Sequence, residues 1–225
     1  MHDIRLLGLH ISVYTRIARL ALEEKQVNYR FEEVDVFADD GIYPDYLALN
    51  PFGMIPTLVH GELVLYETAA IARYVDEISP GESLQPDLPA ARARMNQIIG
   101  ALDHYGYKPM VWDVYVQRVA VPAGGGDSDE RLIASALPGI RKLLSELSRW
   151  RGEQGFLVGD RVTLADLHLY PMLYYFAMTP EGQDLMSEFP RLEHWSTLME
   201  TRPSVLATPF HVTATAGDGD SDTRH

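Results

Sequence analysis

Residues 54–77, MIPTLVHGELVLYETAAIARYVDE, contain the signals that decide the fold of this chain. The β-branched and aliphatic runs at 54–60 and 63–66 favour strands, and His60-Gly61-Glu62 between them is typical of a turn. A helical pattern follows from Thr68 to Asp76. The stretch therefore predicts an antiparallel hairpin that leads directly into a helix.

Upstream of this hairpin, strand-like runs alternate with helical ones. Strands are predicted at 4–9 and 29–36, and helices at 13–26 and 44–49. The face of 29–36 is mixed in polarity, but its β-branched and aromatic content favours a strand. The resulting order, βαβαββα, predicts a parallel strand pair that is extended by the antiparallel hairpin.

The character of the chain changes near residue 79. Residues 79–89 are rich in proline, glycine and serine, which is typical of a linker. Beyond them the pattern is almost entirely helical, with one apolar stripe around Met95 to Leu102 and another from Leu132 to Leu147. The glycines of 122–129 follow no strand and indicate a loop. We therefore expect an α/β domain over 1–78, a linker over 79–89, an all-helical domain over 90–212 and a disordered acidic tail over 213–225.

Composition excludes several classes of function. The 225 residues include 19 basic and 32 acidic side chains, a formal charge of −13, so nucleic acid and anionic membranes are poor partners. The absence of cysteine removes disulfides, thiolate metal sites and cysteine nucleophiles. The eight histidines lack metal-ligand spacing, so we expect no metal. Neither a membrane-spanning run nor a signal peptide is recognisable, which favours a cytoplasmic protein.

Three stretches carry a resemblance to a known family. SVYTRIARLALEEK (12–25), NPFGMIPTLV (50–59) with LYETAAIARYV (65–75), and FLVGDRVTLADLHLYPML (156–173) follow one another at the spacing found in cytosolic glutathione S-transferases. The chain resembles this family over roughly residues 4–210, and its serine-type, bacterial or theta-like members in particular. The resemblance implies a thioredoxin-like N-terminal domain, an all-helical C-terminal domain and glutathione as co-substrate.

Ser12 stands where a predicted strand ends and a helix begins. From the sequence alone, its hydroxyl is expected to cap the helix by accepting a backbone N–H. The resemblance implies a second role, in which the hydroxyl donates to the glutathione thiolate beside the positive end of the helix. Tyr14 is the alternative hydroxyl, because other classes of the family use tyrosine. Arg16 and Arg19 follow in the same helix and are expected to be solvated at the surface.

The hairpin region supplies the predicted glutathione-binding residues. A proline that opens a strand is ordinarily trans, whereas the resemblance implies a cis Ile55-Pro56 bond with the Ile55 backbone turned towards the cysteinyl unit of glutathione. Thr68 is expected to cap the helix that follows. The resemblance implies that Glu67 and Thr68 bind the γ-glutamyl end of glutathione. Met54 departs from the family pattern, because many relatives have lysine or glutamine there to meet the glycyl carboxylate.

The negative charge near this segment also matters for an anionic co-substrate. Asp39, Asp40 and Asp45 precede the hairpin and disfavour glutathione binding. The electrophile is expected between the domains, in a pocket lined by Leu9, His10, Tyr105, Trp112 and Tyr115. The family usually forms homodimers, in which Asp103 would reach the partner's glutathione amine. Thr163 and Asp166 form a predicted capping box and are assigned to folding.

Three classes of function remain open. The first is an enzyme that adds the glutathione thiolate to a small hydrophobic electrophile, with isomerisation and dehalogenation as close variants. The second, a thiol-disulfide reductase, is nearly excluded because it needs a cysteine where Ser12 stands. The third is a non-catalytic module that keeps the fold but has lost the co-substrate. Met54 and the acidic segment favour it, whereas the intact set of Ser12, Ile55-Pro56 and Glu67-Thr68 argues against it.

Overall fold

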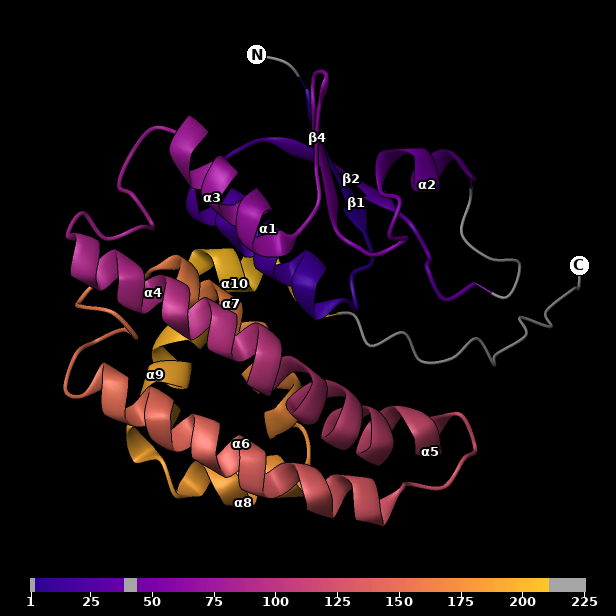
Figure 1. Ribbon diagram of the computed structural model, residues 1–225, viewed down its shortest axis with the longest axis vertical. Coiled ribbons are helices and arrows are strands. Elements are labelled where there is room, and N and C mark those ends of the chain that lie inside the picture. Colours follow the sequence, from indigo (N-terminus) through magenta and orange to yellow (C-terminus); the bar gives the residue numbers. More distant parts are fainter. Residues whose placement is uncertain (1–2, 39–43, 211–225) are drawn as a thin grey trace, which may run out of the picture.

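The computed structural model describes residues 3–38 and 44–210, and it divides into a sheet with its helices and a bundle of helices (Figure 1). The sheet contains β1 (Ile4–Gly8), β2 (Tyr29–Glu33), β3 (Thr57–His60) and β4 (Leu63–Leu65) in the order β2-β1-β3-β4. β1 and β2 are parallel, and β3 is antiparallel to both β1 and β4. The predicted parallel pair with an antiparallel hairpin is confirmed.

Three helices belong to the sheet. They are α1 (Val13–Glu24), α2 (Pro44–Leu49) and α3 (Thr68–Ile78). α1 and α3 pack against each other, and α1 also contacts the helical bundle, so this helix lies between the two parts of the molecule (Figure 1). Leu6 of β1, Leu58 of β3, Ile17 of α1 and Ile71 of α3 are fully buried and form the centre of this core.

The strands are shorter than the sequence predicts. β2 ends at Glu33 instead of residue 36, and β3 begins at Thr57 instead of residue 54. The second difference has a local cause, because Pro56 has no N–H to donate to a ladder. α1 ends at Glu24, two residues earlier than predicted, and Gln26 follows with a φ of 52°.

The second part of the described chain is helical. Its elements are α4 (Pro89–Ala101), α5 (Val121–Ala123), α6 (Glu130–Arg151), α7 (Leu164–Ala177), α8 (Pro180–Ser187), α9 (Pro190–Glu200) and α10 (Pro203–Ala207). α4 continues into wider π-helical turns over Leu102–Gly106 (η1) and Lys108–Ala120 (η2). Both predicted apolar stripes face the core, with Met95 and Leu102 buried on one and Ile140 and Leu144 on the other.

The predicted capping box begins α7. The backbone N–H and the hydroxyl of Thr163 donate to Asp166 Oδ2 at 2.8 and 2.7 Å. Asp166 Oδ1 accepts from the Leu157 N–H and from Trp195 Nε1, both at 2.8 Å. Because Asp166 is fully buried and its oxygens are occupied by these four donors, the assignment of this motif to folding is confirmed.

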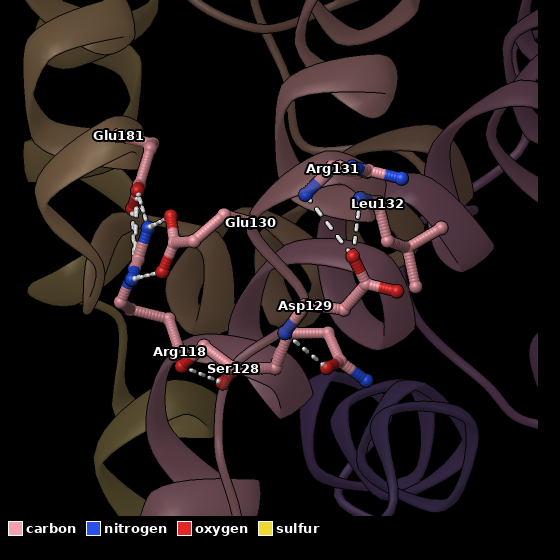
Figure 2. A network of polar contacts seen from close by, with 8 residues as sticks. Arg118, Ser128, Asp129, Glu130, Arg131, Leu132 and Glu181 are labelled. Atoms are coloured by element: carbon pink, nitrogen blue, oxygen red, sulfur yellow. Dashed lines mark hydrogen bonds and ion pairs between the residues drawn. The ribbon is translucent and has the colours of Figure 1, made fainter.

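A cluster of charged groups closes the predicted loop between η2 and α6 (Figure 2). The Arg118 guanidinium donates to Glu130 Oε1 at 2.7 Å and, through Nε, to Glu181 Oε1 at 3.0 Å. Asp129 caps α6 by accepting the N–H groups of Arg131 and Leu132 at 3.0 Å. These contacts join η2, α6 and α8, so this loop has a structural role.

An ion pair is buried where α1 and α3 end. Lys25 Nζ lies 3.1 Å from Asp76 Oδ1, and the two side chains are only 3% and 1% exposed. Lys25 also donates to the Glu82 carbonyl at 2.8 Å, and the Leu84 N–H donates to Asp76 at 2.8 Å. Burial acts to raise the Asp76 pKa, but these and other bonds outweigh it, so the net pKa lies below the ordinary value. The predicted linker is thus fastened to the sheet domain.

The end of the described chain returns to the first helix. Arg202 Nε and Nη2 donate to the two carboxylate oxygens of Glu24, both at 2.6 Å. The Ser204 hydroxyl donates to the same carboxylate at 2.5 Å. α10 therefore holds the end of α1, across 178 residues of sequence.

Candidate functional site

The strand register brings three distant segments to one end of the sheet. Leu7 lies opposite Thr57, and Leu58 lies opposite Leu65. Because β3 is antiparallel to both β1 and β4, the residues that follow β1, precede β3 and follow β4 meet at the same end. We call this the site end, and its connections carry Ser12, Ile55 and Glu67.

Ser12 is the N-cap of α1, as the sequence predicts. Its backbone is extended, with φ −78° and ψ 125°, and its Oγ accepts the Thr15 N–H at 3.2 Å. A hydroxyl that accepts through a lone pair still has its own proton to donate. The two roles considered for Ser12 are therefore compatible: the same oxygen can cap the helix and donate to a thiolate.

The Tyr14 hydroxyl is already engaged as a hydrogen-bond donor within the chain. Tyr14 Oη donates to Asp103 Oδ1 at 3.1 Å, and its ring lies 4.4 Å from that of Tyr107. Burial, followed by the negative charge of Asp103, raises the pKa of the Tyr14 phenol. This contact joins α1 to η1, so Tyr14 connects the two parts of the chain and its hydroxyl is already engaged as a donor.

Asp103 has a second donor that the sequence did not reveal. His168 Nε2 lies 2.8 Å from Asp103 Oδ1, and the His168 side chain is buried. Burial acts to raise the Asp103 pKa, but His168 and Tyr14 outweigh it, so the net pKa lies below the ordinary aspartate value. A histidine within the apolar run LADLHLYPML was the available signal. The predicted contact with a partner's glutathione remains a prediction.

The connection before β3 is fixed by buried polar side chains. The Asn50 Nδ2 and Tyr46 Oη atoms donate to the Met54 carbonyl at 2.7 and 2.6 Å. Asn50 Oδ1 accepts the Phe52 N–H at 3.1 Å, and Gly53 takes a φ of 62° that suits glycine. The asparagine and glycine of this motif therefore set the backbone path that presents residues 54–56.

Ile55 presents its backbone at the site end. The Ile55-Pro56 peptide is cis, as the resemblance implied and against the expectation from the proline alone. Within the described part of the chain, neither the N–H nor the C=O of Ile55 takes part in a hydrogen bond. An extended peptide can pair with such a free backbone. The Met54 side chain beside it is 67% exposed.

The start of α3 differs from the sequence prediction. Thr68 was expected to cap the helix, but it is the first helical residue, and Glu67 occupies the N-cap. Glu67 has φ 68° and ψ 106°, and no side chain of the described residues caps the helix. A non-glycine residue in this region costs about 1–3 kcal/mol and is typical of functional sites. The uncapped positive end of α3 is therefore suited to an anion.

The predicted electrophile pocket is only partly assembled. Trp112 lies 6.3 Å from Phe37, ring centre to ring centre, so these two exposed rings face each other across the domains. Phe37 was not predicted. Tyr105 is exposed, whereas Tyr115 is buried against Tyr175 with ring centres 4.3 Å apart.

Two other predicted pocket residues, Leu9 and His10, are half-buried at the tip of β1. Arg19 Nη1 lies 2.9 Å from His10 Nδ1. Because arginine can only donate, this imidazole nitrogen accepts. The His10 ring also packs on Phe31 at 4.4 Å. His10 is thus tied to β2 and α1, so its ring is already engaged within the domain.

The expectation that Arg16 and Arg19 are solvated is wrong. Arg16 is 3% exposed, and its guanidinium lies 3.9 Å from the centre of the Phe210 ring. Arg19 is also buried, against Phe31. The reason is that α1 packs against α3, α7 and α10, so few of its faces meet water.

No helix within 3–38 and 44–210 combines the length and apolar character that a bilayer span requires. Across the same ranges, His, Asp and Glu side chains form no group of three or more that could hold a metal ion. Asp39 and Asp40, which were expected to weaken glutathione binding, and the predicted tail at 213–225 lie outside the described residues.

Comparisons with known proteins agree with this arrangement. Residues 11–78 match the family model for the glutathione S-transferase N-terminal domain, and residues 110–203 match the model for the C-terminal domain. Glutathione S-transferase F13 of Arabidopsis thaliana is 28% identical over 90% of this chain and 93% of its own length. Glutathione S-transferase 1 of Triticum aestivum is 27% identical over 88% of this chain and 90% of its own.

Solved structures give the same result. Glutathione transferase F7 from Populus trichocarpa superposes with a TM-score of 0.81 at 27% identity, over 91% of this chain and 97% of its own. A theta-class glutathione S-transferase from Xanthomonas axonopodis pv. citri, solved with glutathione bound, has a TM-score of 0.78 at 28% identity. It covers 92% of this chain and 97% of its own.

Proposed function

Because this chain belongs to the glutathione S-transferase family, we propose that it transfers an alkyl or aryl group from a small hydrophobic electrophile to the thiol of glutathione. The observation that carries the proposal is the site end itself. Three groups there are unsatisfied within the described chain: the Ser12 O–H, the Ile55 backbone and the uncapped start of α3. Each of them matches a different part of glutathione.

Glutathione would be held along its length by these groups. Its cysteinyl backbone pairs with the N–H and C=O of Ile55, next to Pro56. Its γ-glutamyl carboxylate meets Thr68 and the N-terminus of α3, while its amine meets the Glu67 carboxylate. Met54 supplies no charge for the glycyl carboxylate, so glutathione binding depends on the cysteinyl and γ-glutamyl parts of the co-substrate.

Ser12 would then activate the sulfur. A free thiol has a pKa near 8.5, and a hydrogen bond to a charged group contributes about 1.5–3 kcal/mol. That corresponds to about one to two pKa units, and the positive end of α1 acts in the same direction. The thiolate attacks the electrophilic carbon, a C–S bond forms and the leaving group departs with the electron pair of its bond. Ser12 is a hydrogen-bond donor in this step and forms no covalent intermediate.

We assign this role to a serine, as in the bacterial and theta-like members that the sequence resembles, although the curated relatives named above come from plants. The Tyr14–Asp103 contact supports the choice, because it occupies the rival hydroxyl. The domain limits of 1–78, 79–89 and 90–212 and a cytoplasmic location belong to the same proposal. A break between α3, which ends at Ile78, and α4, which begins at Pro89, supports the limits.

We also propose that the chain forms a homodimer. Exposed apolar side chains near the site end support it: Phe52 lies 5.6 Å from Tyr66, ring centre to ring centre, and Met54 is exposed nearby in the sequence. A second copy would cover these side chains. Light scattering is expected to give twice the chain mass, and a mass near 25.3 kDa at micromolar concentration would contradict the proposal.

The function is tested by binding and turnover together. Calorimetry with glutathione should give a saturable signal, and the protein should conjugate a general aromatic electrophile. Absence of saturation up to millimolar glutathione would refute the proposal. The exposed Met54 favours one alternative, a binding module that has lost the reaction, and binding without turnover of any electrophile would identify it. Turnover without a stable conjugate would indicate the isomerase or dehalogenase variants.

A further inference from the structure

A hollow remote from the site end lies where α6 ends and α9 begins. Its volume is about 430 Å³, and its walls include Arg151, Glu153, Arg191 and His194. Ligand pockets typically measure about 300–1,000 Å³. All of the lining residues belong to the helical part of the chain, so the hollow shares no residue with the connections that carry Ser12, Ile55 and Glu67.

Arg151 is a buried cation with no carboxylate in direct contact among the described residues. The residue is 4% exposed, Nη2 donates to the Gly155 carbonyl at 3.2 Å, and Nε is buried with no partner. In the described part of the chain no carboxylate lies within ion-pair distance of its guanidinium. Burial lowers the Arg151 pKa. A buried charge that is neither paired nor fully hydrogen-bonded is expensive.

The nearby carboxylates are already engaged. Glu153 forms an ion pair with Arg191. Asp166 accepts hydrogen bonds from four donors inside the core. Asp166 and Glu153 therefore act on the charge of Arg151 only from beyond ion-pair distance, which leaves a place for an anion in direct contact.

We propose that this hollow binds a small organic or inorganic anion through a carboxylate or phosphate group, with Arg151 as the buried anchor and Arg191 as its partner at the mouth. The planar guanidinium matches the oxygens of either group. His194 offers a further donor. The hollow has two arginines, Arg151 and Arg191, and one carboxylate, Glu153. Its local charge is therefore positive, although the chain has a formal net charge of −13.

The backbone adds to the attraction. α9 begins at Pro190, on the wall of the hollow, and no side chain caps its N-terminus at Phe189. The positive end of an 11-residue helix therefore opens at the same place. Since none of these groups belongs to the site end, this inference stands independently of the proposed function.

The test titrates the full-length chain with inorganic phosphate and, separately, with succinate, while sodium chloride keeps the ionic strength constant. Calorimetry should show saturable binding, and the melting temperature should rise with concentration because the ligand binds only the folded state. The better of the two probes identifies the group that the hollow prefers. Arg191→Ala should weaken binding about tenfold or more, as expected for the loss of a charge-assisted hydrogen bond.

Two further variants sharpen the result. Arg151→Met should abolish binding without lowering the stability of the unliganded protein, since it removes an unbalanced buried charge. Arg149→Ala, an exposed arginine on the same helix that pairs with Glu146, changes the net charge equally and should bind normally. Failure of both probes to saturate would overturn the proposal. So would equal weakening by Arg149→Ala and Arg191→Ala, or unchanged binding in Arg191→Ala, even if Arg151→Met does not fold.

Discussion

The two ends of the sheet domain differ in whether the chain itself provides hydrogen-bond partners for their polar groups. At the end where α1 and α3 finish, Lys25 and Asp76 are paired, buried and further bonded to the segment over 79–89. We call this the fastened end. At the site end, where the same helices begin, the Ile55 backbone has no hydrogen bond within 3–38 and 44–210, and Glu67 has a positive φ with no side chain of these ranges capping α3. One end satisfies its polar groups internally, and the other leaves them unsatisfied within the described residues.

Under the proposed function, this difference gives the two ends of one pair of helices different roles, one in stability and the other in binding. A buried unsatisfied group destabilises a fold, so such groups are tolerated only where something else compensates. In this domain the polar groups of the fastened end are bonded within the chain. Substitutions at that end should therefore change folding, and substitutions at the site end should change chemistry.

The largest effect is expected at the fastened end. Lys25→Met leaves Asp76 buried without its cation, which should lower the free energy of unfolding by about 3–5 kcal/mol. Urea denaturation measures the loss, and glutathione affinity of the folded protein should remain unchanged. Arg149→Met removes an exposed ion pair as the control and should have no resolvable effect. Equal losses in both variants would remove the distinction between the ends.

The next effect concerns Ser12. Ser12→Ala should slow conjugation at neutral pH about tenfold to a hundredfold and raise the pKa of the bound thiol, because a hydrogen bond to the thiolate is lost. Loss of the cap should also cost about 1 kcal/mol of stability. The measurements are the pH profile of conjugation and the ultraviolet absorbance of the thiolate.

Tyr14→Phe is the matched control for Ser12→Ala. It removes the hydroxyl that donates to Asp103 without opening a cavity, and the thiol pKa should not move. An unshifted profile in Ser12→Ala together with a shifted one in Tyr14→Phe would assign the activation to the tyrosine.

A smaller effect is expected for the Glu67 charge. Glu67→Gln should raise the KM for glutathione about twofold to fivefold, because an exposed charge pair contributes about 0.2–1 kcal/mol. kcat and stability should not change, since the residue shapes the start of α3 through its backbone. Glu62→Gln in the hairpin turn alters the same charge and serves as the control. A loss of stability in Glu67→Gln alone would show that the carboxylate supports the fold.

The smallest effect is a pH dependence of the stability that Asp103 contributes where it contacts Tyr14 of the other domain. The Asp103 pKa is lowered in the folded state. Its contribution to stability is therefore present above the ordinary aspartate pKa, about 3.9, and is lost as the pH falls through the lower folded value. The difference in unfolding free energy between the wild type and Asp103→Asn should shrink as the pH falls from 7 to about 3. A constant difference over this range would contradict the assignment.

The sequence predicted the order of elements better than their chemistry. Hydrophobic periodicity and turn residues predicted the order βαβαββα and the helical region that follows. They did so because these patterns depend only on residues that are close in the sequence. The burial of Arg16 was missed, since an isolated helical pattern does not show that other elements cover several faces of α1. The pairing of Asp103 with His168 was missed because it joins residues 65 apart.

At the site, prediction succeeded where a residue type has one local role. Ser12 before a helix is a cap by its chemistry alone, and the structure confirms it. Thr68 was misplaced by one position, because nothing in the sequence signals that Glu67 adopts a positive φ. Phe37 was missed as the neighbour of Trp112, since the two lie in different domains.

The contact between Glu24 and Arg202 has a consequence for synthesis of the protein. The ribosome makes the sheet domain first, but the partner of Glu24 is made 178 residues later. The first helix therefore reaches its final set of contacts only after nearly the whole polypeptide has emerged. Nascent chains that stop before residue 202 should leave the end of α1 open to proteases and chaperones, and completion of the chain should end that exposure.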